Sequence, residues 1–324
     1  MDIPGITKIN LDGRLAPGAR PRGLWSDAWR SLMRNRIALL GLLISLLIGL
    51  LALFGNSVSP YNPNRQDLDH VAEGPSAEHW LGTDQLGRDY FSRVAAGART
   101  ALLVGFTVTL IACLLGIVLG AVSAYAGGLT DMLVSRLSDA TMAFPKLLLA
   151  SFVNATAKPP FQAALAWVAA RTGLALLTDT VIADYIVVLG ALSLTLWYGY
   201  ARLVRGEILR LREMDFVLSA RAIGASPWQI VRRHLIPNAL APIIIYATAG
   251  IGEAMLLEAS LSYLGIGIQP PGASWGQMIS TSIDQWRYAP HLVAIPGVVL
   301  ALAVLGFNLL GDGVNDALDP RRRR

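Results

Sequence analysis

The residues of this sequence that could do chemistry in an unusual place are three charged side chains inside long apolar stretches. Lys146 follows a proline in one stretch, and Glu253 and Glu258 stand in another. A charge inside a membrane is costly, so such residues mostly line a polar pathway or pair with one another. We expect Lys146, Glu253 and Glu258 to lie on a translocation path or to act as intramembrane charges, with Lys146 paired to Glu253 or Glu258. For Glu258, packing between helices is an equally open interpretation.

Motifs for enzymatic chemistry are missing from the sequence. No GxxxxGK[ST] phosphate-binding loop, HExxH or CxxC metal motif, or GxSxG nucleophile motif occurs, and none of the three lysines follows a glycine. The four histidines are scattered along the chain (His70, His79, His234 and His291). We therefore expect no enzyme activity, no catalytic residue, no metal site and no cofactor bound by this chain. An ion-coupled transporter that acts alone stays open, because of the three intramembrane charges.

The composition places the chain in a membrane. Of its residues 54% are hydrophobic and only 15% are charged, whereas a soluble domain carries about a quarter charged residues. The net charge of +5 would suggest a nucleic-acid partner if the protein were soluble. The arginines flank apolar runs, however, and indicate membrane orientation instead, so no nucleic-acid partner is expected.

Cys113 lies in an apolar run and is interpreted as a small core residue. The first apolar run is long enough to stay as an anchor, so no cleaved signal peptide is expected.

Uncharged or nearly uncharged runs predict an all-α integral membrane protein with six transmembrane helices. They are Ile37–Phe54, Ala101–Ala126, Leu133–Val153, Tyr185–Ala201, Ala239–Leu261 and Leu292–Gly311. The third is the weakest, because it holds three charges, and Pro145 is expected to kink it. Arg136 and Asp139, three residues apart, are expected to pair.

The distribution of positive charge predicts the orientation. With six spans and both termini in the cytoplasm, most of the 27 lysine and arginine residues fall on the cytoplasmic side. A seventh span at Phe161–Leu177 would invert the Arg-rich loop 202–238, so this stretch is interpreted as a surface or re-entrant helix on the outer face, after a break at Lys158-Pro159-Pro160. In the outer loop, Asp84, Arg88 and Asp89 are expected to form an ion-paired cluster.

These spans divide the chain into five parts. The expected parts are a cytoplasmic N-terminal segment at 1–36, the first transmembrane helix at 37–54, an external loop at 55–100, a five-helix core at 101–312 with an external insertion at 154–184 and a cytoplasmic loop at 202–238, and a basic cytoplasmic tail at 313–324. Residues Leu24–Ala38 are interpreted as an interfacial amphipathic helix in contact with membrane lipid, or simply as the cytoplasmic end of the first span.

A second candidate site is Asp215–Pro237, which reads DFVLSARAIGASPWQIVRRHLIP. It predicts a helix over Asp215–Ile223 that ends at Gly224 in the left-handed conformation. Ser226 then caps a second helix with Pro227 at its first position, and this helix is expected to end at Pro237. Such a compact pair of helices, rich in arginine and small residues at a membrane face, suits docking of a soluble partner. A loop that only fixes the topology is the alternative.

This segment resembles the EAA loop of ABC importer permeases, which has Glu-Ala-Ala, three residues, Gly, nine residues and Ile-x-Leu-Pro. Here Leu218, Ser219 and Ala220 take the first three positions and Gly224 the glycine position. The resemblance implies a cytoplasmic coupling helix that sits in a cleft of a separate ATPase. The implied coupling residues are Asp215, Leu218, Ser219, Ala220, Arg221, Ala222, Gly224, Ala225 and Ser226. Because Leu218 replaces the acidic residue and Ser219 the first alanine, docking would rest on shape, Gly224 and the arginines.

The resemblance covers most of the chain. WRSLMRNRIALLGLL at 29–43, HWLGTDQLGRDYFSRVAAGAR at 79–99, AFP at 143–145, GYARLVRGEILRLREMDFV at 199–217, EASLSYLGIGIQPPGASWGQMI at 258–279 and GDGVNDALDPR at 311–321 resemble the second permease of dipeptide and oligopeptide importers. Relatives of that subgroup also include nickel and oligosaccharide systems, which the sequence does not separate from peptide importers.

The family resemblance implies the type I ABC importer permease fold and a set of partners. These are a homologous second permease, two ATPase subunits that bind ATP and Mg²⁺, and an external substrate-binding protein, at the cytoplasmic membrane of a bacterium or archaeon. Two features depart from the pattern: the 154–184 region is longer than usual, and Lys146 follows AFP where a small or apolar residue is familiar. The longer region is expected to contact the binding protein or the partner permease.

Overall fold

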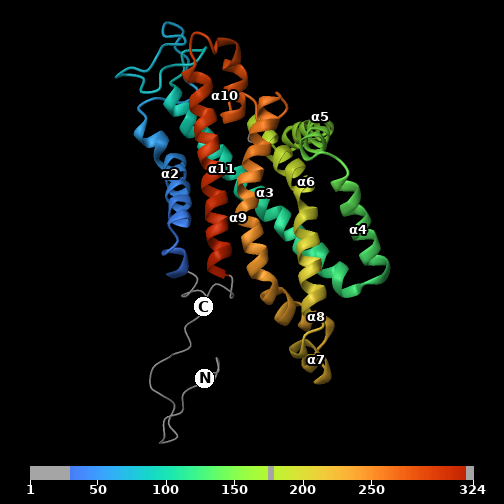
Figure 1. Ribbon diagram of the computed structural model, residues 1–324. Coiled ribbons are helices and arrows are strands. Elements are labelled where there is room, and N and C mark those ends of the chain that lie inside the picture. Colours follow the sequence, from blue (N-terminus) through green and yellow to red (C-terminus); the bar gives the residue numbers. More distant parts are fainter. Residues whose placement is uncertain (1–29, 174–178, 319–324) are drawn as a thin grey trace, which may run out of the picture.

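The computed structural model describes residues 30–173 and 179–318, and this part of the chain forms helices and no β-strand (Figure 1). The helices are α2 (Arg36–Val58), α3 (Tyr90–Ala126), α4 (Gly128–Met142), α5 (Lys146–Thr172), α6 (Thr180–Leu211), α7 (Asp215–Ala222), α8 (Pro227–Ile230), a π-helical turn (Val231–Leu235), α9 (Ile236–Tyr263), α10 (Trp275–Ser282), a 3₁₀ turn (Ile283–Gln285) and α11 (His291–Leu318).

Five helices of the described residues are long and apolar enough to cross a membrane. They are α2, α3, α6, the continuous helix Pro227–Tyr263, and α11. Their outer faces carry exposed leucine, valine and phenylalanine side chains, for example Leu47 and Phe54 on α2 and Leu110 and Leu114 on α3. Such faces suit contact with lipid, because hydrocarbon offers no penalty to apolar side chains.

The bundle is centred on α3, which packs against both α6 and α9. Glycines allow the close approach: a Cβ on Gly116 would lie 2.3 Å from Tyr200 Cβ on α6, and one on Gly105 would lie 2.8 Å from Met255 Cγ on α9. Small residues are favoured where membrane helices meet, since they let backbones approach and gain van der Waals contact. At one end of the bundle, the start of α2 lies beside the end of α11, where Asn35 donates to Asp316 (3.2 Å).

The expected third span, Leu133–Val153, is two helices and not one kinked helix. Helix α4 ends at Met142, and α5 begins at Lys146, after Pro145. Proline lacks the N–H that would continue the helix, and it disfavours helical backbone in the residue before it. Figure 1 shows α5 nearly end-on, whereas α4 and α6 extend across the view.

The segment 131–158 connects the two ends of α6. Near the C-terminal end of α6, Arg205 donates to Asp131 at the start of α4 (2.6 and 2.7 Å). Near the N-terminal end of α6, Lys158 Nζ lies 2.7 Å from the buried carboxylate of Asp184. The chain therefore passes along the length of α6 within α4 and the first turns of α5.

The break expected at Lys158-Pro159-Pro160 is absent. Helix α5 runs through both prolines and ends at Thr172, with Gly173 in the left-handed conformation (φ +70°). Two contacts hold this part of α5 in place: the Lys158–Asp184 ion pair, and a hydrogen bond from the Asn154 amide to the carbonyl of Ile266. Tertiary contacts thus outweigh the local cost of the prolines. Of the stretch 161–177, residues 174–177 lie outside the described residues.

Two other boundaries and one ion-pair cluster differ from the sequence expectation. The expected helix Leu24–Ala38 is interrupted in its described part, because Asn35 begins α2 by accepting hydrogen bonds from the N–H groups of Ile37 and Ala38; its residues before 30 lie outside the described residues. Helix α11 continues to Leu318, into the segment expected to be the tail, while 319–324 are not described. In the outer loop Arg88 pairs with Asp84 as expected, whereas Asp89 contacts His79 and caps α3.

The close contact of α3 and α6 predicts unequal effects for two glycine-to-alanine changes. In Gly116→Ala the new methyl group collides with the backbone and Cβ of Tyr200, and such overpacking costs about 1–3 kcal/mol. In Gly190→Ala on α6 the methyl group meets nothing within 4 Å, so stability stays equal or rises slightly. Thermal unfolding of the purified variants in detergent measures both, and equal midpoints would contradict the proposed packing.

Candidate functional site

Helix α7 is the first element of the site and is anchored through two small apolar residues. Val217 and Ala220 are buried in a cluster with Val204 and Ile208 of α6 and with Ile230 of α8. Asp215 stands in the first turn, where a negative charge interacts favourably with the helix dipole. The helix expected over Asp215–Ile223 is therefore present, ending one residue earlier at Ala222.

The turn after α7 has the conformation that the sequence predicts. Gly224 has φ +84°, and its N–H donates to Arg221 O (3.0 Å), while the N–H of Ala225 donates to Ala220 O (3.0 Å). This pair of bonds closes the helix end in a Schellman motif, which requires a left-handed residue at the glycine position. The turn places α7 and α8 side by side in a short, compact unit.

The start of α8 is also as predicted, but its end is not. Ser226 and Gln229 form a reciprocal capping box, and Pro227 is the first helical residue. The helix does not end at Pro237: it passes through the π-helical turn Val231–Leu235 into α9. Pro237 has no N–H for the carbonyl four residues earlier, and the wider π turn, closed by Ile236 N–H to Val231 O, accommodates that loss. Pro237 is the one residue in the sequence that could have indicated this π-helical turn. A proline at this position is equally typical of the start of a new helix.

The outward surface of this unit is unusually apolar for a loop. Phe216, Leu218, Ile223 and Trp228 are 39%, 48%, 86% and 67% exposed. The same unit carries three exposed arginines that form no salt bridge within the described residues (Arg221, Arg232 and Arg233). Exposed apolar patches of this kind mark interaction sites, and aromatic side chains and arginine are enriched in protein interfaces. We call the surface formed by Phe216, Leu218, Ile223, Trp228 and the three arginines the loop surface.

The nine residues implied by the sequence resemblance do not all face outward. Asp215, Leu218, Ser219, Arg221, Ala222, Gly224 and Ser226 are exposed, and Ala225 is half-buried. Ala220 is buried and packs in the core, so it holds α7 in place and is not on the loop surface. Next to it, an open hollow is lined by the apolar side chains of Phe216 and Ile223 and by Ser219, Gln229, Arg233 and His234.

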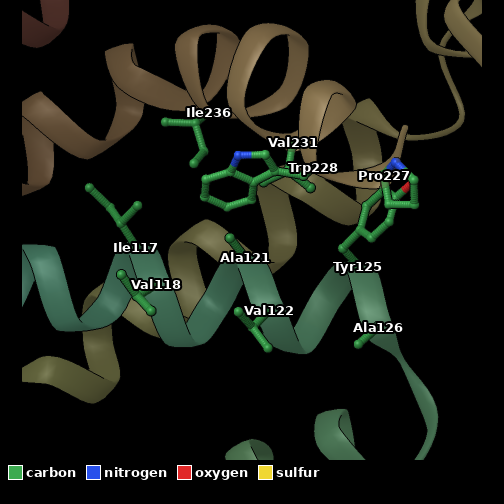
Figure 2. Close-up of a pocket in the computed structure, with 10 residues that line it drawn as sticks. All are labelled: Ile117, Val118, Ala121, Val122, Tyr125, Ala126, Pro227, Trp228, Val231 and Ile236. Carbon is green, nitrogen blue, oxygen red and sulfur yellow. The ribbon is translucent and has the colours of Figure 1, made fainter. Parts of the chain in front are cut away.

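A wholly apolar groove lies behind the loop surface, between α3 and the helix that starts at Pro227. Figure 2 shows the Trp228 indole above α3, with Ile117, Val118, Ala121 and Val122 on the α3 side and Val231 and Ile236 on the other. Its volume is about 380 Å³. Open space on this side means that Trp228 is not fixed by close packing against α3, so the start of α8 has room to shift.

Polar contacts tie α6 to its neighbours beside the loop. Arg212 donates to the carbonyl of Ala124 (3.0 Å), and Arg205 binds Asp131 through two bonds. Ser123 also donates a hydrogen bond to the Asp131 carboxylate (2.5 Å). Asp139 pairs with Arg202 on α6 (2.8 Å), so the expected pairing of Asp139 with Arg136 is wrong.

The three intramembrane charges occupy two different settings. Lys146, the first residue of α5, forms an ion pair with Glu253 of α9, one of the two pairings that the sequence left open. Both side chains stay more than a third exposed, at 38% and 37%. Glu258 is 1% exposed and accepts a hydrogen bond from Ser262 (2.8 Å), so it belongs to the helix packing. Among the described residues, no group of three His, Cys, Asp or Glu side chains could hold a metal ion.

The left-handed turn at Gly224 predicts different effects for two substitutions at this position. A Cβ at this position meets nothing within 4 Å, so the only cost of a side chain is backbone strain, about 1–2 kcal/mol. Gly224→Val should open the end of α7 and speed hydrogen exchange at the amides of 215–225, whereas Gly224→Asn should stay close to wild type because asparagine tolerates this conformation. Hydrogen–deuterium exchange of the purified chain tests this, and equal exchange in Val and Asn variants would refute the role of φ.

Comparison with known proteins gives matches along almost the whole chain. Residues 116–324 match the family described as binding-protein-dependent transport system inner membrane component, and residues 23–75 match the N-terminal TM domain of oligopeptide transport permease C. The chain is 38% identical to a dipeptide transport system permease protein of Alkalihalophilus pseudofirmus, over 92% of this chain and 90% of that protein. It is 36% identical to a glutathione transport system permease protein of Pectobacterium atrosepticum (92% and 91% covered) and 34% identical to an oligopeptide transport system permease protein of Bacillus subtilis (93% and 91%).

Proposed function

This chain belongs to the family of binding-protein-dependent transport system inner membrane components, and from that premise we propose that it is a transmembrane permease subunit of an ATP-driven importer of di- and oligopeptides. The three relatives named above carry dipeptides, oligopeptides and glutathione by their names, and all of these are short peptides. Their shared class favours a peptide over nickel or an oligosaccharide as the substrate. Dependence on a binding protein, which the family description names, disfavours an ion-coupled transporter that acts alone.

The subunit crosses the membrane six times in this proposal, with both termini in the cytoplasm. The start of α2 and the end of α11 lie at the same end of the bundle, which requires an even number of crossings. Five crossings are the five long apolar helices, and the sixth is α4 with the first turns of α5, which pass along the length of α6. The excess of arginine around α7 and α8 supports a cytoplasmic position for the loop surface.

The loop surface is where separate ATPase subunits would dock. The observation that carries this step is the cluster of exposed apolar side chains with free arginines at the cytoplasmic end of the spans. ATP and Mg²⁺ would be bound by those partner subunits. Leu218 stands where the family has an acidic residue, so apolar contact and shape take over from an ion pair at this position.

Force from the ATPase would reach the membrane through packed helices. Val217 and Ala220 join α7 to the end of α6 and to α8, and the helix from Pro227 to Tyr263 continues without interruption into the bundle. A packed unit of this kind moves as a body, because its core has discrete arrangements and does not deform smoothly. A homologous second permease would complete the passage, and an external binding protein would deliver the peptide.

The proposed docking predicts loss of coupling when the apolar residues are removed. In Phe216→Ala/Ile223→Ser, peptide uptake and binding-protein-stimulated ATP hydrolysis of the reconstituted complex should fall at least about tenfold, the effect of losing roughly 1.4 kcal/mol of binding free energy. Leu114→Ala, at an exposed site on α3, is the control and should stay close to wild type. The proposed docking surface would be refuted by a double variant that still binds its ATPase subunits and takes up peptide at the wild-type rate.

We also propose that the second half of α5, in the long 154–184 region, contacts the external binding protein. Trp167 is 57% exposed, and the Arg171 guanidinium stacks on its ring at 3.8 Å, which makes a rigid aromatic–cationic feature on the outer side. The partner permease is the other candidate for this contact.

That contact predicts a change in the response to the binding protein. Trp167→Ala/Arg171→Ala should raise several-fold the concentration of binding protein needed for half-maximal ATP hydrolysis, with the maximal rate retained, and Ala163→Ser on the same helix should leave it unchanged. Should the double variant instead lose assembly with the second permease, the contact is with that subunit. An unchanged concentration dependence in an assembled complex refutes contact with the binding protein.

A further inference from the structure

We infer that the Lys146–Glu253 ion pair lines the passage and forms a site that binds the charged termini of a peptide in transit. This inference rests on the proposed function, and it assigns to two residues a task that the family match leaves open. It begins from an ion pair between α5 and α9 whose two side chains stay partly exposed.

The position of the ion pair among the membrane helices limits what its exposed side can face. Glu253 lies within the continuous membrane helix Pro227–Tyr263, and Lys146 opens α5 directly after the break at 143–145. With the pair formed, 38% of the lysine and 37% of the glutamate side chain remain exposed. Exposure of these charges to hydrocarbon costs several kilocalories per mole, so this face of the bundle does not face lipid. It faces water or another protein.

The residues around Glu253 support an aqueous face. Tyr246, Ala249, Glu253, Leu256 and Ser260 recur at three- and four-residue spacing and form one partly or fully exposed stripe along α9. The stripe carries an aromatic hydroxyl, a small, a charged, an apolar and a polar side chain in turn. Tyr198 of α6 also lies close enough to the Lys146 ammonium to interact with its charge. We call these five residues the α9 stripe.

Two other faces of the bundle give the contrast. Between residues 103 and 118, the exposed face of α3 carries only apolar side chains, among them Leu103, Phe106, Leu110, Leu114 and Val118, as a lipid-facing surface should. Glu258, five residues after Glu253, points into the protein and is bonded to Ser262. The α9 stripe is therefore the face of this subunit with the features of a passage, and Glu258 is outside it.

The chemistry of the pair selects its ligand. A short peptide with free termini carries one ammonium and one carboxylate, and the pair offers one carboxylate and one ammonium. The peptide carboxylate can bind Lys146 while the peptide ammonium binds Glu253, so one ion pair is exchanged for two and no charge is left without a partner in the membrane. A neutral solute cannot make this exchange, because separating the pair would leave both charges unpaired.

A labelling experiment tests whether the stripe is aqueous. In the complete reconstituted complex with Cys113→Ala, the variants Ala249→Cys and Ser260→Cys should react with a charged methanethiosulfonate reagent at least about tenfold faster than Leu110→Cys on the apolar face of α3. Dialanine in excess, with the binding protein, should slow the reaction at Ala249→Cys. Equal rates at stripe and control positions would overturn the inference.

A transport experiment tests the role of the charges. Lys146→Met, Glu253→Gln and the double variant should each lower the amount of radiolabelled dialanine taken up per ATP hydrolysed at least about fivefold. If the pair only held α5 against α9, the neutral double variant would recover the wild-type ratio, and that recovery would overturn the inference. Failure of the wild-type complex to take up dialanine would count against the proposed function instead, and the labelling rates would then decide whether the pair lines an aqueous passage.

Discussion

The cost of placing a charge in hydrocarbon constrains where the helices of this chain can lie. Three ion pairs in the interior of the bundle or at its edge join different helices: Lys146 with Glu253, Lys158 with Asp184, and Arg205 with Asp131. The first two pairs attach α5 to α9 and α6, and the third attaches the start of α4 to α6. Because α4 and α5 are the long helices with the fewest buried residues, these pairs fix the path of the chain between α3 and α6 and, with it, the proposed sixth crossing.

One helix connects the two functional regions. Trp228 on the loop surface and Glu253 in the ion pair belong to the continuous helix Pro227–Tyr263, and 25 residues of helix separate them by about 38 Å. A docked ATPase that displaced α8 would therefore also move the α9 stripe, because both belong to one continuous helix. The π-helical turn Val231–Leu235 is the place in that helix where the backbone hydrogen-bond register changes. The apolar groove beside Trp228 leaves space for movement of the helix there.

The family match and the departures from it have separate consequences. The matched regions cover the bundle and the loop, so the general task of the subunit follows from them. The departures are local: Leu218 in place of an acidic residue makes the proposed docking surface more apolar, and Lys146 introduces a charge that Glu253 balances. Each departure has a structural partner or an exposed setting that gives it a physical reason.

The sequence by itself determined the features that depend on a few neighbouring residues or on overall composition. Long uncharged runs gave the membrane class, Gly224 the left-handed turn, and Ser226 with Gln229 the helix cap, because each of these has its cause within one or two helical turns. The tertiary structure alone decided the continuous helix through Pro159 and Pro160, the pairing of Asp139 with Arg202 instead of Arg136, and the choice of Glu253 over Glu258 as the partner of Lys146. These outcomes depend on which faces of distant helices meet, and residues that are 107 positions apart along the chain, such as Lys146 and Glu253, share no local signal that records their contact.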